Sequence, residues 1–173
     1  MDIERIKKNI RNVPDFPKPG IQFKDITPIL QDPELFGNVI DIFYERYKNE
    51  KIDVIVGIES RGFIFAAPLA LKLCCSFVLA RKSGKLPSET VCSYYDLEYG
   101  TDSLEIHKDS LQIGDNILIV DDLLATGGTT RAVIDLVNKL QGNIFEIAYL
   151  VELSDLDNKE NLEEINKFSI IKL

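Results

Sequence analysis

Short, mainly apolar runs recur along the chain and predict the strands of a central sheet. They occupy residues 52–58, 77–80, 117–120 and 145–151. The run at 117–120 is β-branched at three of its four positions, which is typical of a strand buried on both faces of a parallel sheet. A last apolar segment at 168–173 predicts an edge strand.

Helical spacing of apolar residues fills the intervals between these runs. Apolar positions follow Pro33 as far as Tyr47 and recur from Ala132 to Leu140. A further helix is expected to begin near Phe65, with Pro68 tolerated in its first turn. Strands that alternate with helices predict an α/β fold, a twisted and mainly parallel sheet flanked by helices and joined by right-handed crossovers.

The N-terminal part has a different pattern. Ile3, Ile6 and Ile10 share one face of a short helix that is expected to end by Val13-Pro14. The prolines of residues 15–28 exclude a helix and a central strand, so we expect an extended, ordered surface segment. It could be an arm packed on the core or part of a ligand site.

Two other segments leave the sheet pattern. Residues 89–106 alternate enough to form a hairpin-like excursion, whose tyrosines and Gly100 are compatible with a loop that covers a site as well as with a plain hairpin. Residues 162–167 are polar and predict a short helix or a turn.

Length, charge and cysteine content restrict the class of protein. A chain of 173 residues is long enough for one domain, so residues 1–173 are expected to form a single domain. Its net charge of −8 disfavours nucleic acid as the main partner, and any anion site must gather cations locally or bind a metal with the ligand. No apolar run approaches the roughly 20 residues that span a bilayer, and no signal peptide is visible. Three cysteines without a C-x-x-C motif favour reduced thiols and a cytoplasmic location.

Most of the residues that suggest a ligand site directly follow the strand at 117–120. Asp121 and Asp122 are expected where that strand emerges, and a loop of small and hydroxyl-bearing residues leads from them into the next helix. Glycines allow main-chain N–H groups to approach an oxyanion, and the helix N-terminus adds unpaired donors. Carboxylates would repel a phosphate but accept hydrogen bonds from sugar hydroxyls. A ribose with a 5′-phosphate fits both parts. The loop residues are Ala125, Thr126, Gly127, Gly128, Thr129 and Thr130.

Cations gather after two other strands. Ser60 and Arg61 follow the strand at 52–58, and a guanidinium matches pyrophosphate oxygens bidentately. Arg81 and Lys85 follow the strand at 77–80, where they could form an anion site or simply a solvated charged face. We favour the anion site, because the ends of neighbouring parallel strands are where α/β folds bind ligands.

The stretch Val120-Asp121-Asp122-Leu123-Leu124-Ala125-Thr126-Gly127-Gly128-Thr129 resembles the phosphoribosyl-pyrophosphate (PRPP) motif of type I phosphoribosyltransferases, in the form found in the adenine enzymes. The Phe-Pro-x-Pro-Gly-x-x-Phe pattern of residues 16–23 resembles the adenine-binding hood of that family, here residues 1–30. The resemblance covers nearly the whole chain.

This resemblance implies the purine-salvage reaction in which adenine and PRPP give AMP and pyrophosphate. Asp121 and Asp122 would hold the ribose, residues 125–130 the 5′-phosphate, and Ser60, Arg61, Arg81 and Lys85 the pyrophosphate. Phe23 would stack on the base, whose edge the main chain of Gln22 and Lys24 would read. The implied catalytic residues are Glu98, Tyr99 and Arg61. Mg²⁺, bound mainly through PRPP or pyrophosphate, and a homodimer are implied as well.

Three alternatives stay open. The central motif could be an ordinary strand-helix unit with an acidic loop. The enzyme could use another base, although oxopurine enzymes tend to carry an acidic residue where Ala125 stands. The fold could also serve a PRPP-sensing regulator, but the chain has no spare length or basic helix for a DNA-binding module.

Overall fold

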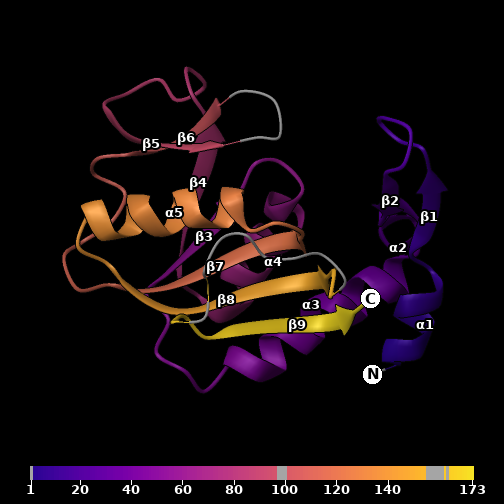
Figure 1. The fold of residues 1–173 in the computed structure, drawn as a ribbon. Coiled ribbons are helices and arrows are strands. Elements are labelled where there is room, and N and C mark those ends of the chain that lie inside the picture. The colour runs from indigo at the N-terminus through magenta and orange to yellow at the C-terminus, as the bar shows by residue number, and fades with distance from the viewer. Residues whose placement is uncertain (1, 97–100, 155–161, 163) are drawn as a thin grey trace. The chain divides into compact units, whose positions relative to one another are not determined.

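The computed structural model of the chain describes residues 2–96, 101–154, 162 and 164–173 (Figure 1). The chain divides into two compact units, Met1–Arg46 and Tyr47–Leu173. Each is described by itself. Among the described residues, no helix combines the length and the hydropathy needed to cross a membrane.

The first unit contains three helices and a small antiparallel ribbon. Its helices are α1 (Ile3–Lys8), α2 (Thr27–Gln31) and α3 (Pro33–Tyr47), and its strands are β1 (Arg11–Pro14) and β2 (Gln22–Asp25). The guanidinium of Arg5 on α1 donates to the carboxylates of Asp32 and Glu34 at 2.9 and 2.8 Å, which joins α1 to the start of α3. The bounds of α3 confirm the helix that was expected to follow Pro33.

Two expectations for this unit were wrong in detail. The first helix ends at Lys8, because Arg11–Pro14 pairs with β2 instead of continuing as irregular chain. The prolines do not keep helix out of the whole 15–28 segment, because α2 begins at Thr27. Pro28 lies in its first turn, where a main-chain N–H would have no partner inside the helix anyway.

The second unit is built on a seven-stranded sheet in the order β5-β6-β4-β3-β7-β8-β9. The five strands β4, β3, β7, β8 and β9 pair in parallel with one another, whereas β6 runs antiparallel to β4 and β5. The strands are β3 (Val54–Ile58), β4 (Ser76–Lys82), β5 (Thr90–Asp96), β6 (Thr101–His107), β7 (Asn116–Leu124), β8 (Asn143–Glu152) and β9 (Lys167–Lys172). The predicted mainly parallel α/β sheet is confirmed.

Two helices cover opposite faces of this sheet, as Figure 1 shows: α5 (Gly128–Lys139) lies in front of the sheet, and α4 (Gly62–Leu73) lies behind it. α4 begins at Gly62 rather than near Phe65, so Pro68 lies inside the helix and removes one main-chain hydrogen bond there. From β3 the chain crosses through α4 to β4, and from β7 it crosses through α5 to β8, in opposite directions along the sheet. The carboxyl ends of β3 and β7 therefore flank a topological switch point, the usual ligand position in such sheets.

β5 and β6 form the expected hairpin, and they are attached to α5. Nζ of Lys139 donates to the main-chain oxygen of Cys92 at 2.5 Å, and the hydroxyl of Ser93 lies 3.5 Å from the carboxylate of Asp135. The hairpin is thereby held beside the helix that follows β7.

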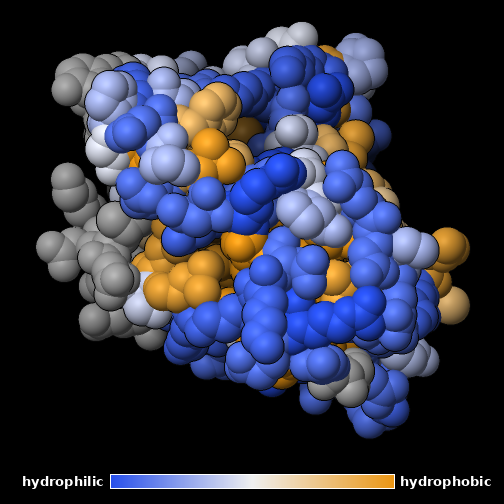
Figure 2. All heavy atoms as spheres, turned by 90° about the vertical axis from the view of Figure 1, so that its right-hand side faces the viewer, coloured by the Kyte–Doolittle hydropathy of each residue, from blue (hydrophilic) through white to orange (hydrophobic). Residues whose placement is uncertain are grey.

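Hydrophilic side chains dominate the face of the molecule in Figure 2, with smaller hydrophobic areas between them.

Candidate active site

The acidic pair lies inside β7, although the sequence placed it beyond the strand. β7 keeps its pairing with β8 as far as Leu124 and Glu152, whereas its pairing with β3 ends at Gly57 and Val120. Asp121 and Asp122 therefore occupy an extension of β7 that has a strand neighbour on one side only. This extension stands at the switch point, next to the end of β3.

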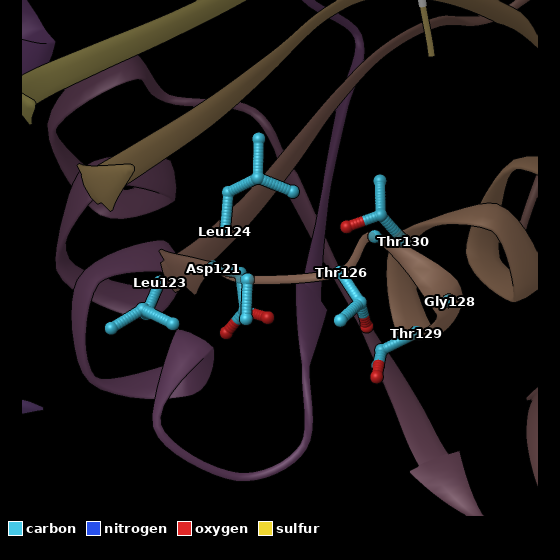
Figure 3. Close-up of a pocket in the computed structure, with 9 residues that line it drawn as sticks. Asp121, Leu123, Leu124, Thr126, Gly128, Thr129 and Thr130 are labelled. Carbon is cyan, nitrogen blue, oxygen red and sulfur yellow. The ribbon is translucent and has the colours of Figure 1, made fainter. Parts of the chain in front are cut away.

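A pocket of about 300 Å³, counting the part open to solvent, begins at this extension. Its lining residues are Asp121, Leu123, Leu124, Ala125, Thr126, Gly127, Gly128, Thr129 and Thr130. Figure 3 shows the carboxylate of Asp121 at one end and the hydroxyls of Thr126 and Thr129 close together at the other, with Thr130 on the opposite side of the loop. The structure thus brings together one of the two predicted ribose ligands and the entire predicted phosphate loop.

The floor of the pocket is the N-terminus of α5. Gly127, the residue before the helix, has a φ of 84°, a left-handed conformation that glycine adopts without steric cost. The first helical hydrogen bond runs from the N–H of Arg131 to the carbonyl of Gly127. In the described part of the chain, the N–H groups of residues 128–130 have no hydrogen-bond acceptor, so they and the helix dipole offer an anion-binding surface.

The threonines of this loop face different partners. The hydroxyl of Thr130 is buried and lies 2.8 Å from the hydroxyl of Tyr149 on β8, so its side chain holds the loop against the sheet. The hydroxyl of Thr129 is hydrogen-bonded to that of Tyr95 on β5. Because its hydroxyl is taken, Thr130 can offer a ligand only its main-chain N–H. The sequence alone does not show that the hydroxyl is taken.

The two aspartates have unusual electrostatics. Burial and the neighbouring charge of Asp122 raise the pKa of Asp121 well above its ordinary value, despite the hydrogen bond that its Oδ1 accepts from the N–H of Asp122 at 2.8 Å. Burial also raises the pKa of Asp122, whose Oδ2 lies 2.9 Å from Nε of Arg61. Among the described residues this oxygen accepts no hydrogen bond of good geometry, so it retains acceptor capacity.

The end of β3 comes very close to the acidic pair. A Cβ on Gly62, the first residue of α4, would lie 2.7 Å from the carbonyl oxygen of Val120 and 2.9 Å from Oδ1 of Asp121. No side chain larger than hydrogen fits between these backbones. The partly exposed Arg61 and, before it in the chain, the exposed Ser60 therefore stand beside the ribose-binding candidates.

The basic cluster stands at the end of β4, which extends through Lys82 and so includes Arg81, although the sequence placed Arg81 after the strand. It gathers around an acid that sequence reasoning did not assign to the site. The side chain of Glu59 is only 8% exposed and accepts from Nζ of Lys85 at 2.7 Å and from the N–H of Lys82 at 2.8 Å. Nε of Arg81 lies 3.4 Å from the same carboxylate. Burial works to raise the pKa of Glu59, but these hydrogen bonds and charges hold it below its usual range.

Glu59 thereby joins the end of β4 and the loop after it to the loop after β3. Arg81 and Lys85 are brought to the switch point next to Ser60 and Arg61. The position of Glu59, directly after a buried strand, was the signal that could have identified it.

In the first unit, the residues proposed to bind the base lie on β2. The rings of Phe16 and Phe23 meet edge to face with their centroids 5.1 Å apart. Nζ of Lys24 donates to Oδ1 of Asn12 at 3.0 Å, and Nδ2 of Asn12 donates to Oε1 of Gln22 at 2.7 Å. Both polar side chains are thus used within the ribbon.

The remaining predicted residues, Glu98 and Tyr99, lie outside the residues that the structure describes. The strands that lead into and out of this segment are β5 and β6. The assignment of Glu98 and Tyr99 therefore stays a prediction.

Comparison with known proteins agrees with this arrangement. Residues 25–172 match the family model described as phosphoribosyl transferase domain. Adenine phosphoribosyltransferase of Halothermothrix orenii is 54% identical over 167 residues, which cover 96% of this chain and 98% of that protein.

Solved structures extend the likeness to the whole fold. The crystal structure of adenine phosphoribosyltransferase from Thermoanaerobacter pseudethanolicus superposes with a TM-score of 0.95 at 50% identity, over 99% of both chains. The enzyme of Saccharomyces cerevisiae, complexed with adenine and an imino-altritol 1,6-bisphosphate, superposes with a TM-score of 0.92 at 41% identity, over 98% of both chains.

The fold and the site thus define a phosphoribosyltransferase. Within that class, the chain belongs to the adenine phosphoribosyltransferase family.

Proposed function

We propose that this enzyme transfers the 5-phosphoribosyl group of PRPP to adenine and releases AMP and pyrophosphate, a purine-salvage reaction. One observation carries the proposal from the structure: the carboxylate of Asp121 and a loop with acceptor-free N–H donors line one pocket at the switch point. The relatives named above are adenine phosphoribosyltransferases over their full length.

The lining of the pocket supports one orientation of PRPP. Residues 125–130 receive the 5′-phosphate on the N-terminus of α5, where donors and the helix dipole favour negative charge. Asp121 and Asp122 would repel a phosphate, so they accept hydrogen bonds from the ribose hydroxyls. The pyrophosphate then points toward the end of β3, the side on which Arg61 approaches Asp122.

Four residues are proposed to bind the pyrophosphate: Ser60, Arg61, Arg81 and Lys85. In the ligand-free arrangement, Arg81 and Lys85 surround the carboxylate of Glu59. Pyrophosphate offers these cations a more highly charged partner, and a guanidinium can bind it bidentately. Glu59 keeps the cations in place until the ligand arrives.

Mg²⁺ is proposed to enter with PRPP or pyrophosphate. Mg²⁺ commonly retains several waters and binds through one or two carboxylates together with substrate phosphates. Of the acidic pair, Asp121 is the carboxylate that lines the pocket and could contact such an ion, whereas Oδ2 of Asp122 is buried beside Nε of Arg61. When bound, the ion would offset charge on the leaving pyrophosphate.

The chemical step is a displacement at C1′ of the ribose, where charge resembling an oxocarbenium ion develops as pyrophosphate departs. Arg61, between the acidic pair and the pyrophosphate residues, is placed to stabilise the departing charge. Glu98 is proposed to move a proton to or from the base, a role that typically contributes ~10²–10⁴-fold, and Tyr99 to assist it.

Adenine is proposed to bind to the N-terminal hood, residues 1–30, with Phe23 stacked on the base. Pro14 is opposite Gln22 in the β1–β2 ribbon and has no N–H, so this pair cannot exchange two hydrogen bonds. The alternation of an antiparallel ladder then assigns the bonded pair to Val13 and Phe23. The main-chain groups of Gln22 and Lys24 face the opposite edge of β2, which suits them to read the edge of a base.

The proposal also includes an oligomeric state and a cellular location. A homodimer follows from the family resemblance. A cytoplasmic location follows from the cysteine usage of the sequence, and Cys74, Cys75 and Cys92 are free thiols.

The test is an assay of pyrophosphate release with PRPP, Mg²⁺ and a panel of free bases. Adenine has a 6-amino donor and an N1 acceptor, whereas hypoxanthine has the reverse pattern, so kcat/KM should be ~10⁴-fold or more higher for adenine. Equal values for the two bases would overturn the adenine assignment. Binding of PRPP without turnover of any base would indicate the regulator instead.

A further inference from the structure

A second buried acid, Glu105, lies beneath the basic loop and has no role in the mechanism above. Glu105 is on β6, opposite Arg81 on β4 and Cys92 on β5, and is only 5% exposed. Its burial prevents it from touching a substrate, so any contribution to the reaction must pass through its neighbours.

Its hydrogen-bond partners lie in the segment that connects β4 to β5 and at the first residue of β5. Oε1 of Glu105 accepts from the N–H of Gly84 at 3.0 Å and from the N–H of Leu86 at 3.2 Å. Oε2 accepts from the hydroxyl of Thr90 at 3.2 Å. One carboxylate thus binds the main chain immediately before and immediately after Lys85.

Lys85 itself is held at two further points. Its carbonyl accepts from Nη1 of Arg81 at 3.1 Å, and its ammonium reaches Oε1 of Glu59 at 2.7 Å. Glu105 fixes where the main chain of this residue runs, and Glu59 fixes where the ammonium ends. A flexible lysine side chain delivers its charge reproducibly only when its own backbone is fixed.

We propose that Glu105 is a positioning residue for Lys85, whose carboxylate holds the basic loop so that the Lys85 ammonium stands at the pyrophosphate end of the site. This inference rests on the proposed role of Lys85 in binding pyrophosphate. It predicts that Glu105 affects the binding affinity for pyrophosphate and PRPP but not the affinity for ligands that lack a pyrophosphate group.

The hydrogen-bond pattern also predicts which substitution is tolerated. The carbonyl oxygen of glutamine can accept from both main-chain N–H groups, while its amide donates to the hydroxyl oxygen of Thr90. E105Q should therefore preserve the loop. Leucine removes all three hydrogen bonds, and aspartate is one methylene too short to reach the loop from the same position on β6.

The experiment measures the dissociation constants of magnesium pyrophosphate and of AMP by calorimetry for the unmutated protein, E105Q, E105L and E105D, with thermal melting to verify folding. E89L is the matched control, since Glu89 is in the same connection but its side chain is 83% exposed. We expect E105L and E105D to weaken pyrophosphate binding about tenfold, which is the lower end for one charge-assisted hydrogen bond, and to leave AMP within about twofold. E105Q and E89L should resemble the unmutated protein for both ligands.

The background variant K85A separates this inference from the proposed site. In K85A, adding E105L should cause no further loss of pyrophosphate affinity, because the residue on which Glu105 acts is absent. If K85A weakens pyrophosphate but E105L and E105D do not, or if they weaken AMP equally, Lys85 keeps its role and the positioning inference is overturned. An unchanged affinity in K85A itself would overturn both. If E105L does not fold, E105D and E105Q decide the matter in the same way.

Discussion

Replacing Asp121 with asparagine should make the protein more stable at neutral pH and weaken its binding of ribose phosphates. Burial and the charge of Asp122 raise the pKa of Asp121 well above the ordinary 3.8, so its ionised form is disfavoured in the folded protein. Asparagine keeps an oxygen to accept the N–H of Asp122 but carries no charge. D121N therefore removes the electrostatic cost and preserves the local hydrogen bond.

The loss of binding can be scaled from the contact that disappears. Hydrogen bonds to charged groups contribute about 1.5–3 kcal/mol each, so losing one ribose contact should weaken PRPP and AMP roughly 10- to 150-fold. Stability should change in the opposite direction. The two effects together would show that the charge serves the ligand rather than the fold.

The pH dependence provides a sharper test. Because the folded protein keeps the Asp121 proton to higher pH than the unfolded chain, the folded state binds more protons above pH 3.8, and this group reduces stability as pH rises through its raised pKa. The stability advantage of D121N should therefore be near zero in acid, grow by at most about 1.4 kcal/mol per pH unit, and then become constant. Other acids, such as Glu59 with its lowered pKa, act in the opposite direction, so the difference between the two proteins is the informative quantity.

The measurement is urea unfolding of the unmutated protein, D121N and D109N across this pH range, with calorimetric titration of AMP. Asp109 is exposed in the turn after β6, so D109N controls for the loss of one negative charge. A D121N protein less stable than the unmutated one at pH 7, or a stability difference that does not grow with pH, would refute the reasoning.

Three further predictions concern other parts of the site. E98Q should lower kcat by ~10²-fold or more with little change in PRPP affinity, whereas a change within about twofold in a turnover assay would exclude acid-base catalysis by Glu98. T130V should lower the unfolding free energy by about 1–3 kcal/mol, because the Tyr149 hydroxyl loses its buried partner, and should leave AMP binding nearly intact; T129V, with melting and titration measured in parallel, is the comparison. K24A should keep the preference for adenine over hypoxanthine if the main chain reads the base, and F23A should weaken both bases alike; a K24A protein that accepts hypoxanthine would assign the reading to the side chain.

The parts of the site that follow from sequence are those written in consecutive residues. The apolar run at 117–120, the acids after it and the glycines before a helical pattern together predict a strand, a loop and a helix N-terminus, and all three exist. Their chemistry is local, so no knowledge of distant segments was needed.

The parts that sequence did not predict depend on partners elsewhere in the chain. β7 continues through Asp121 and Asp122 because β8 supplies a ladder there, although aspartate is a poor strand former. Glu59 and Glu105 reach the basic loop only because β3 and β6 lie on either side of β4. The hydroxyl of Thr130 is taken by Tyr149 of β8, which no motif around residue 130 indicates.

The missing side chain at Gly62 has a consequence for how the enzyme can diversify. Since the start of α4 rests on the main chain of β7 at Val120 and Asp121 and on Oδ1 of Asp121, these close contacts at Gly62 set the separation between Arg61 and Asp121. A change of rotamer cannot relieve the contact with the main-chain oxygen of Val120, so there is no room for a methyl group at Gly62. We therefore expect changes of substrate preference in this fold to arise in the surrounding loops and the hood. The distance between Arg61 and Asp121 should stay the same.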